Sequence, residues 1–444
     1  MNRADMERQS LSPRQSIFVG ITLFSMFFGA GNLILPPLVG LQAGADGVPA
    51  MVGFLAAGIG LPVLGIVAVA LAGTIRDLAS RVHPVFASVF VAAVYLAIGP
   101  CLAIPRTSST SFEMLRPLLP AGVSLEMGRL VFSVLFFIAA YLLAMHPGRL
   151  TRLLGHVTGP ALIALIVAVT GAALFNPAPE GIAAAQASYA SAPGLQGFLV
   201  GCQTMDLLAS LTFGIVIATN IRELGVTSDA GLTHEVSRAG LFAGILMVLI
   251  YCGLAVVGAN LSVSDPGLTN GAAILSASAS MHYGTIGLVL VAAIFLLACL
   301  NVCIGLISCC GTYFASVLPK VPYKVWALGF AVFSCVVSNF GLDAILTFSV
   351  PLLNALYPIS IVLVLMGMLH KACDRVPQVW PWVVGPAALV SVATSVRDAF
   401  LPGAWLPFDA IPLASFGMGW VIPSLIGALV GIVHARLARD RAAS

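Results

Sequence analysis

One apolar stretch, residues 17–41, most constrains what this chain can fold into. Its length matches a single membrane-spanning helix, since about 20 apolar residues cross the hydrocarbon core. Its centre, residues 27–37, reads FFGAGNLILPP, with glycines, an asparagine and a proline pair that all weaken a helix. Hydrocarbon cannot hydrogen-bond the backbone groups that such a break releases, so unwound chain is tolerated there only beside protein or a watery cavity. The stretch therefore predicts a polar cavity near the middle of a membrane.

Composition indicates a polytopic, all-α membrane protein. Of the 444 residues, 59% are hydrophobic and 8% are charged, whereas about 25% are charged in an average soluble domain. The net charge of +3 is too small to indicate nucleic-acid binding. The seven histidines fall at predicted helix ends or in loops and most of the nine cysteines fall within apolar runs, so we expect no metal cluster, no disulfide and no cofactor.

Apolar runs of sufficient length predict twelve membrane spans. With both termini cytoplasmic, 16 of the 20 basic residues fall in cytoplasmic segments, which satisfies the positive-inside rule. The four predicted outside are Arg106, Arg116, Arg129 and Arg397. The twelve predicted spans are residues 17–41, 48–72, 85–106, 129–146, 153–175, 194–220, 238–259, 284–315, 324–340, 343–369, 379–398 and 413–435.

A second interrupted span supplies an internal symmetry. Residues 203–206 place a polar QTMD knot near the middle of span six, at the level at which span one is interrupted. Spans one and six run in opposite directions, as the first helices of two inverted five-helix repeats do. We therefore expect repeats at residues 17–175 and 194–369, two further spans at 379–435, and cytoplasmic tails at 1–16 and 436–444.

The break in span one suits a ligand that carries both charges. The free N–H groups at Gly29 to Asn32 begin the outer half-helix and suit a carboxylate. The free carbonyls at Ser25 to Phe28 end the inner half-helix and suit an ammonium group or a sodium ion. The alternative is that the small residues simply form a helix-packing face, but packing does not require Asn32 or the proline pair.

Two polar residues deep in the predicted spans are further candidates. Asp206 has three possible roles: N-cap of the second half of span six, counter-charge for an ammonium group or cation, and proton carrier. A cap that also lends negative potential to the site is favoured. Asn301 in span eight suits equally a cation ligand and a tie between helices. His234 and Glu235 start like a zinc-protease motif, but Arg238 replaces the second histidine, so a solvated cytoplasmic loop is expected.

Several of these stretches together resemble the bacterial branched-chain amino acid:cation symporter family, the BrnQ type of branched-chain amino acid transport system II carrier. The likeness runs nearly end to end, and FGAGNLILPP at residues 28–37 is its most specific part. The other stretches are TMDLLA at 204–209, ACL at 298–300, GLIS at 305–308 and LYP at 356–358. The resemblance implies sodium-coupled uptake of leucine, isoleucine and valine across the inner membrane. It also implies a fold similar to the leucine transporter, with a five-plus-five inverted repeat and broken helices one and six.

The resemblance also implies roles for individual residues. Span eight departs from the family, which usually has two threonines where this chain has Asn301 and Val302, so one hydroxyl becomes an amide and the other an isostere without oxygen. The implied ligands of a sodium ion are Ser25, Phe28, Ala298 and Asn301. The implied substrate-binding residues are Phe27, Gly29, Ala30, Gly31, Asn32, Thr204, Met205, Asp206 and Leu208.

The predicted function is secondary transport of branched-chain amino acids, with a coupling cation and membrane lipids as the other partners. The alternative within transporters is a proton-coupled or exchange carrier for other neutral amino acids or small amines. A membrane-embedded enzyme would need a cluster of catalytic groups within the bilayer, and the predicted spans hold one deep carboxylate and no histidine away from their ends. A channel would usually show a repeated filter or a charge ring, and the sequence has neither.

Overall fold

A computed structural model describes residues 10–119, 124–146, 151–175 and 181–443. Within these ranges the regular structure is helical, with no β-strand. The predicted all-α class is therefore confirmed. Three of the basic residues used to orient the chain, Arg3, Arg8 and Arg149, lie outside the described ranges.

The first half of the chain comprises α1 (Pro13–Phe27), α2 (Ala30–Ala43), α3 (Gly47–Leu55), α4 (Leu61–Ala72), α5 (Ile75–Ser80), α6 (Pro84–Leu96), α7 (Ala103–Leu115), α8 (Leu125–Ala144) and α9 (Gly159–Phe175). The second half comprises α10 (Ala187–Ala190), α11 (Pro193–Cys202), α12 (Asp206–Glu223), α13 (Asp229–Asn260), α14 (Gly271–Tyr283), α15 (Thr285–Val317), α16 (Tyr323–Ser338), α17 (Leu342–Met368), α18 (His370–Cys373), α19 (Val379–Phe400) and α20 (Val421–Ala443).

Length and apolar composition make many of these helices candidates to cross a membrane. Among the described residues there are eight such helices, or nine if α11 and α12, bent by 42° at a short break, form one span. One of the eight is the run Ala30–Ala72, which contains Gly44 at φ +46°, where α2 ends. Two shorter apolar helices, Tyr323–Ser338 and Val421–Leu437, add to these. The chain is a multi-pass membrane protein, and the count of twelve spans stays a prediction.

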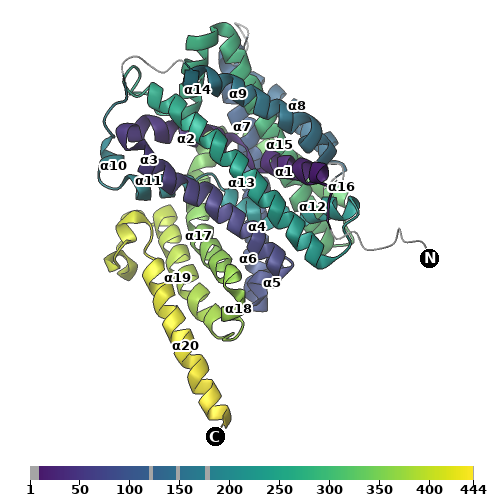
Figure 1. Ribbon diagram of the computed structural model, residues 1–444, viewed down its shortest axis with the longest axis vertical. Coiled ribbons are helices and arrows are strands. Elements are labelled where there is room, and N and C mark those ends of the chain that lie inside the picture. The colour runs from purple at the N-terminus through teal and green to yellow at the C-terminus, as the bar shows by residue number, and fades with distance from the viewer. Residues whose placement is uncertain (1–9, 120–123, 147–150, 176–180, 444) are drawn as a thin grey trace, which may run out of the picture.

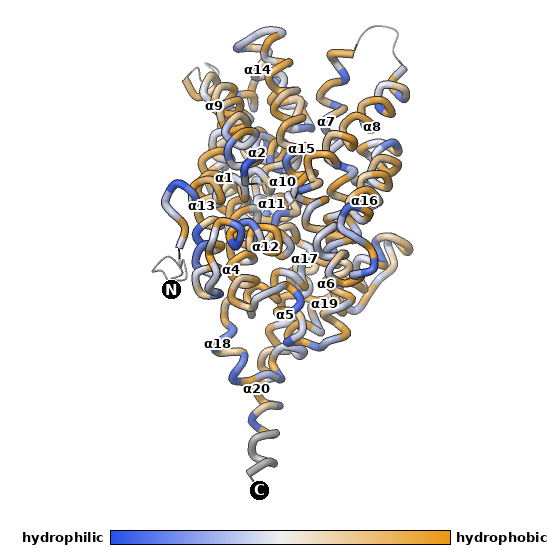
Figure 2. The backbone as a smooth tube through the Cα atoms, turned by 90° about the vertical axis from the view of Figure 1, so that its right-hand side faces the viewer, coloured by the Kyte–Doolittle hydropathy of each residue, from blue (hydrophilic) through white to orange (hydrophobic). Residues whose placement is uncertain are grey.

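Large apolar side chains on the outer helices are exposed. Val48, Phe175 and Phe400 are 77%, 87% and 77% exposed, respectively. Figure 2 shows hydrophobic residues along most of the helical tube, including its outer helices. An aqueous surface rarely carries apolar area on this scale. The exposed residues are therefore the lipid-facing surface of the bundle.

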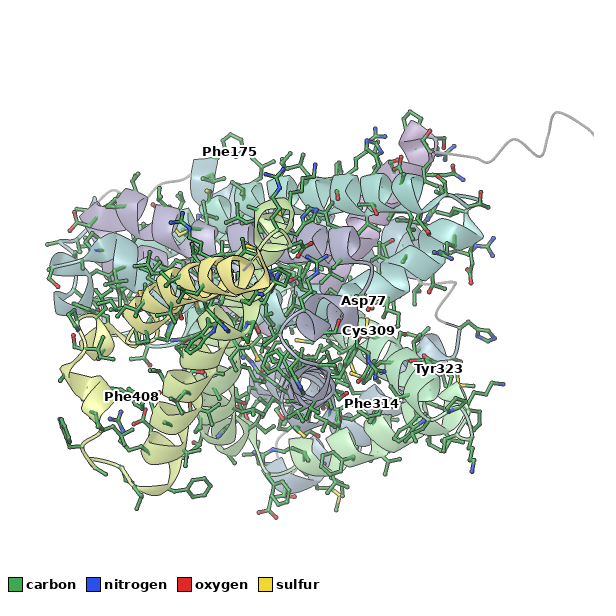
Figure 3. The ribbon with its side chains drawn as sticks, turned by 90° about the horizontal axis from the view of Figure 1, so that it is seen from below. Asp77, Phe175, Cys309, Phe314, Tyr323 and Phe408 are labelled. Atoms are coloured by element: carbon green, nitrogen blue, oxygen red, sulfur yellow. The ribbon has the colours of Figure 1, made fainter. Side chains whose placement is uncertain are left out.

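Helix α13 crosses the bundle and packs against α1, α2 and α4 (Figure 1). The last two long helices, α19 and α20, pack against each other, and α20 extends beyond the lower edge of the bundle (Figure 1). Seen from below, Phe408 in the segment before α20 lies at the opposite edge from Tyr323 at the start of α16 (Figure 3). The α19–α20 pair is thus peripheral, and the centre of the bundle is built by earlier helices.

The segment around Glu235 differs from the prediction of a solvated loop. Glu235 lies in the second turn of α13, and its side chain is fully buried. Its carboxylate accepts hydrogen bonds from Ser16 Oγ at 2.9 Å and from Leu11 N at 3.4 Å. A buried carboxylate is retained where such donors satisfy it. The prediction was wrong because these donors come from the start of α1 and the residues before it, more than 200 residues away in sequence.

Helix α2 packs backbone to backbone against α13, and glycines make this approach possible. A Cβ on Gly258 would lie 1.8 Å from the Pro37 carbonyl oxygen, and one on Gly40 would lie 1.9 Å from the Ala255 carbonyl oxygen. Neither contact leaves room for a methyl group, so small residues are required on both helices. This close contact holds α2 against α13 at the centre of the bundle.

We expect Gly258→Ala to destabilise the protein by about 1–3 kcal/mol, because the added methyl group overpacks the α2–α13 contact. The matched control is Gly253→Ala in the same helix, where the nearest atom, Thr170 Cβ, is 3.7 Å from the added Cβ. The control should be neutral or stabilising by up to about 1 kcal/mol, since alanine favours a helix more than glycine does. Thermal unfolding of both purified variants in detergent measures the difference. Equal stability of the two variants would contradict the packing argument.

Candidate functional site

The helical run that starts with α1 is interrupted at Phe28 and Gly29. Phe28 has φ −75° and ψ 89°, Gly29 has φ −118° and ψ −160°, and α2 begins at Ala30. Gly29 therefore does not need the positive φ that only glycine adopts easily. A Cβ at this position would lie 3.0 Å from Val302 Cγ2 of α15. A larger residue here would press against Val302, so glycine suits the close approach of α15.

The break between α11 and α12 has a different backbone geometry. Met205 takes the left-handed conformation, with φ 68° and ψ 7°, and occupies the cap position of α12. Asp206 is the first residue of the helix, and α12 has no side-chain cap. The predicted role of Asp206 as an N-cap is therefore wrong. Its N–H donates to Thr204 Oγ1 at 3.4 Å, and its carboxylate bonds to other helices instead of capping α12.

A single cavity of about 50 Å³ lies between the two breaks. One predicted substrate-binding residue, Leu208, is fully buried in α12 and does not line it. Residues that were not predicted also line the cavity, among them Phe213, Val302 and Arg106. The structure brings the other eight predicted substrate-binding residues around it: Phe27, Gly29, Ala30, Gly31, Asn32, Thr204, Met205 and Asp206.

Asn32 and Asp206, which line this cavity, form a buried hydrogen-bonded group with Tyr251, which does not line it. Asn32 Nδ2 donates to Asp206 Oδ2 at 2.6 Å and also to the hydroxyl of Tyr251. The Tyr251 hydroxyl in turn donates to Asp206 Oδ2 at 3.3 Å. A carboxylate in an apolar bundle needs such donors, since an unsatisfied buried charge is costly. Three helices, α2, α12 and α13, are thereby joined at the level of the breaks.

The role of Tyr251 could not be predicted, because it lies in the apolar run of residues 238–259 with no polar neighbour to mark it. Its ring is fully buried and lies 5.5 Å from the ring of Phe54 and 6.1 Å from that of Phe28, between centroids. The apolar ring explains why the residue fits a hydrophobic pattern. Only the fold reveals that its hydroxyl reaches Asp206.

The position of Arg106 differs from the predicted topology. The residue was predicted at the outer end of the span 85–106, but it lies in the first turn of α7 and lines the cavity. The prediction ended the span here because residues 107–111 read TSSTS. These hydroxyls bond within the bundle instead: Thr107 Oγ1 donates to the Ile104 carbonyl at 2.6 Å, and Ser109 Oγ donates to the Ser338 carbonyl at 3.1 Å. Such bonds allow a hydroxyl-rich segment to continue as a buried helix.

None of the four predicted sodium ligands, Ser25, Phe28, Ala298 and Asn301, is among the residues that line the cavity. Ser25 is fully buried, and its hydroxyl donates to the Leu154 carbonyl at 3.4 Å. Ala298 and Asn301 are fully buried in α15, where Val302 rather than Asn301 lines the cavity. Neither polar atom of the Asn301 amide has a hydrogen-bond partner. Among the described residues, no group of three or more His, Cys, Asp or Glu side chains could hold a metal ion.

A second cavity of about 390 Å³ lies along the same face of α7. Thr110 and Glu113 line it, at helical spacing from Arg106, and Ile34 lines it one turn beyond Gly31 on α2. Arg116 and Arg129 complete a charged lining. A larger groove of about 630 Å³ is lined by apolar side chains and glycines of α3, α11 and Met418, and has no charged side chain to bind a polar ligand.

The whole fold is shared with transporters of known structure. A mutant of the manganese transporter of Eremococcus coleocola aligns with a TM-score of 0.58 at 14% identity, covering 98% of this chain and 99% of the other. MhsT in complex with L-phenylalanine aligns with a TM-score of 0.56 at 16% identity, covering 96% and 98%. MHP1, a nucleobase-cation-symport-1 family transporter, aligns with a TM-score of 0.55 at 14% identity, covering 97% and 96%. The fold is that of the leucine-transporter-like class.

The family follows from sequence comparison. A family model described as branched-chain amino acid transport protein matches residues 12–438. The branched-chain amino acid permease BraB of Bacillus subtilis is 37% identical over 96% of both chains. The branched-chain amino acid transport system 2 carrier protein of Pseudomonas aeruginosa is 39% identical over 94% of this chain and 95% of its own. The chain belongs to the branched-chain amino acid transport protein family, and its relatives are transport proteins, not enzymes.

Because Asn32 and Asp206 are hydrogen-bonded, we expect the stability losses caused by substitutions at these two positions to be non-additive. Asn32→Ala should cost about 1.5–3 kcal/mol, because it removes the shorter donor to a buried carboxylate. In an Asp206→Asn background the same change should cost less by about 1 kcal/mol or more, since no buried charge then remains to be satisfied. Thermal unfolding of the two single variants and the double variant completes the cycle. Additive losses would show that the two side chains do not depend on each other.

Proposed function

We propose that this protein is a secondary transporter that imports leucine, isoleucine and valine by cation symport, with Na⁺ as the coupling ion. The observation that carries the proposal is the cavity between the two helix breaks, which combines free backbone groups with a charged and an apolar wall. Phe27, Ile98, Phe213 and Leu306 offer the apolar surface that a branched side chain requires. The names of the relatives, branched-chain amino acid permeases and carriers, support the same substrate class.

In this proposal the eight lining residues named above bind the substrate at the middle of the membrane. The N–H groups that begin α2 at Ala30 face the substrate carboxylate, and Asp206, which is hydrogen-bonded to Asn32, supplies negative charge for the ammonium group. A volume of about 50 Å³ suits a few water molecules rather than an amino acid. The helices around the site must therefore move apart for substrate to enter, as alternating access requires.

The proposed topology has twelve spans and both termini on the cytoplasmic side of a bacterial inner membrane. It counts α1–α2 and α11–α12 each as one broken span, and it groups residues 17–175 and 194–369 as inverted repeats. With this orientation the 390 Å³ cavity beside Ile34 lies on the outer side of the site. Its position along α7 makes it the outer access route in this proposal.

Uptake of labelled leucine into proteoliposomes tests the proposed function, with sodium and proton gradients imposed separately. We expect stimulation by an inward sodium gradient and competition by isoleucine and valine. Stimulation of uptake by a proton gradient alone would show that H⁺, and not Na⁺, is the coupling ion. No stimulation by either gradient would exclude symport, and competition by alanine but not by isoleucine or valine would overturn the substrate class.

The proposed coupling by Na⁺ leads to a prediction about the Na⁺ dependence of a variant at Val302. Its side chain lies against Gly29 at the break, where an oxygen would be able to face a bound cation. We expect Val302→Thr, which changes a methyl group to a hydroxyl at nearly constant volume, to lower the half-saturating Na⁺ concentration for leucine uptake about tenfold, equivalent to about 1.4 kcal/mol for one added oxygen ligand.

The matched control is Val291→Thr, the same substitution at a buried position of the same helix that lines a separate apolar cavity of about 10 Å³. This variant should leave the Na⁺ dependence of uptake unchanged. An unchanged Na⁺ dependence in Val302→Thr, with uptake retained, would mean that no cation binds beside Gly29.

A further inference from the structure

The cavity is lined by one positively charged side chain, that of Arg106, to which the proposed function gives no role. Arg106 extends from α7 toward the start of α2, so that its Nη2 would lie 3.0 Å from a Cβ placed on Gly31. The Thr204 carbonyl oxygen would lie 3.6 Å from the same Cβ. The guanidinium is therefore beside both helix breaks. A side chain at position 31 would press against the guanidinium and shift it.

Asp206 attracts the guanidinium of Arg106 electrostatically but is not paired with it in a salt bridge. Among the described residues the guanidinium takes part in no salt bridge and no side-chain hydrogen bond. Asp206 lines the same cavity, but its Oδ2 already accepts bonds from Asn32 and Tyr251. A guanidinium carries five N–H donors, and leaving it unpaired within a membrane bundle is costly. An arrangement of this kind is expected where a ligand supplies the missing anion.

The geometry restricts the chemistry of that anion. The planar fork of a guanidinium matches the two oxygens of a carboxylate. The residues that begin α2, Ala30 and Gly31, line the same cavity as Arg106, and the first N–H groups of a helix favour negative charge. A carboxylate placed between Arg106 and the start of α2 would satisfy donors on both helices.

We propose that Arg106 binds the α-carboxylate of the transported amino acid and makes the carboxylate a condition of recognition. This inference rests on the proposed function, because it assigns the carboxylate of that same substrate to a side chain. The apolar residues of the cavity then select the side chain of the substrate, while Arg106 rejects molecules of the same shape that lack the carboxylate. Rejection follows because such a molecule leaves the guanidinium unpaired.

Equilibrium competition with labelled leucine on the purified protein in detergent tests this assignment. Leucinol has the side chain and amine of leucine but carries a hydroxymethyl group in place of the carboxylate. The quantity measured is the ratio of the inhibition constants of leucinol and leucine. We expect a high ratio in the unmodified protein and a ratio about 10- to 100-fold lower in Arg106→Gln, because charge-assisted hydrogen bonds are lost with leucine only.

The matched control is Arg116→Gln, which removes a positive charge from the second cavity, beyond the end of the same helix. This control should keep the ratio of the unmodified protein. An Arg106→Gln variant that weakens leucine and leucinol by the same factor would overturn the proposal and give Arg106 a structural role or a role in holding an inorganic anion. Absence of leucine binding to the unmodified protein would instead overturn the proposed function.

Arg106→Lys covers the case in which Arg106→Gln does not fold. Lysine keeps the charge but loses the two-pronged geometry, so the ratio should fall about 3- to 30-fold while binding of leucinol stays nearly constant. A ratio equal to that of the unmodified protein would exclude bidentate binding of the carboxylate by Arg106.

Discussion

A helix interrupted at the centre of an apolar helical bundle depends on partners for the backbone groups that it frees, and this requirement organises the centre of the molecule. At Phe28 and Gly29 the chain leaves the helix between α1 and α2, and lipid cannot satisfy the groups exposed there. The break is surrounded by α7, α12, α13 and α15, which provide polar side chains and close packing. The cavity exists because these helices shield unwound chain from hydrocarbon.

Helix α13 contributes to this arrangement in two ways at once. Its glycine and alanine backbone lies directly against α2 near Pro37 and Gly40. Two turns away, Tyr251 reaches the carboxylate of Asp206 and the amide of Asn32. Packing and hydrogen bonding therefore fix the same half-helix from the same side. Any rearrangement of the site must either carry α13 along with α2 or break both kinds of contact.

The sequence was informative where the backbone itself is unusual. Glycine, asparagine and proline at residues 29–37 mark a place where a helix is weak, and the structure has an interruption there. Residues of this kind predicted the positions of both breaks. Eight of the nine predicted substrate-binding residues line one cavity. Arg106, Glu235 and Tyr251 could not be placed, because their surroundings come from helices distant in sequence. A charged residue beside a Ser/Thr-rich segment resembles a loop until the fold supplies its partners.

The two cavities along α7 lie about one helical turn apart. Thr107 lines the inner cavity and Thr110 the outer one, just as Gly31 and Ile34 do on α2. One turn of a helix rises about 5.4 Å, which is the length of a short alkyl linker. A small molecule with an amino acid headgroup and a polar group carried on such a linker would span both cavities. The spacing of the two cavities thus offers a design rule for inhibitors that occupy both at once.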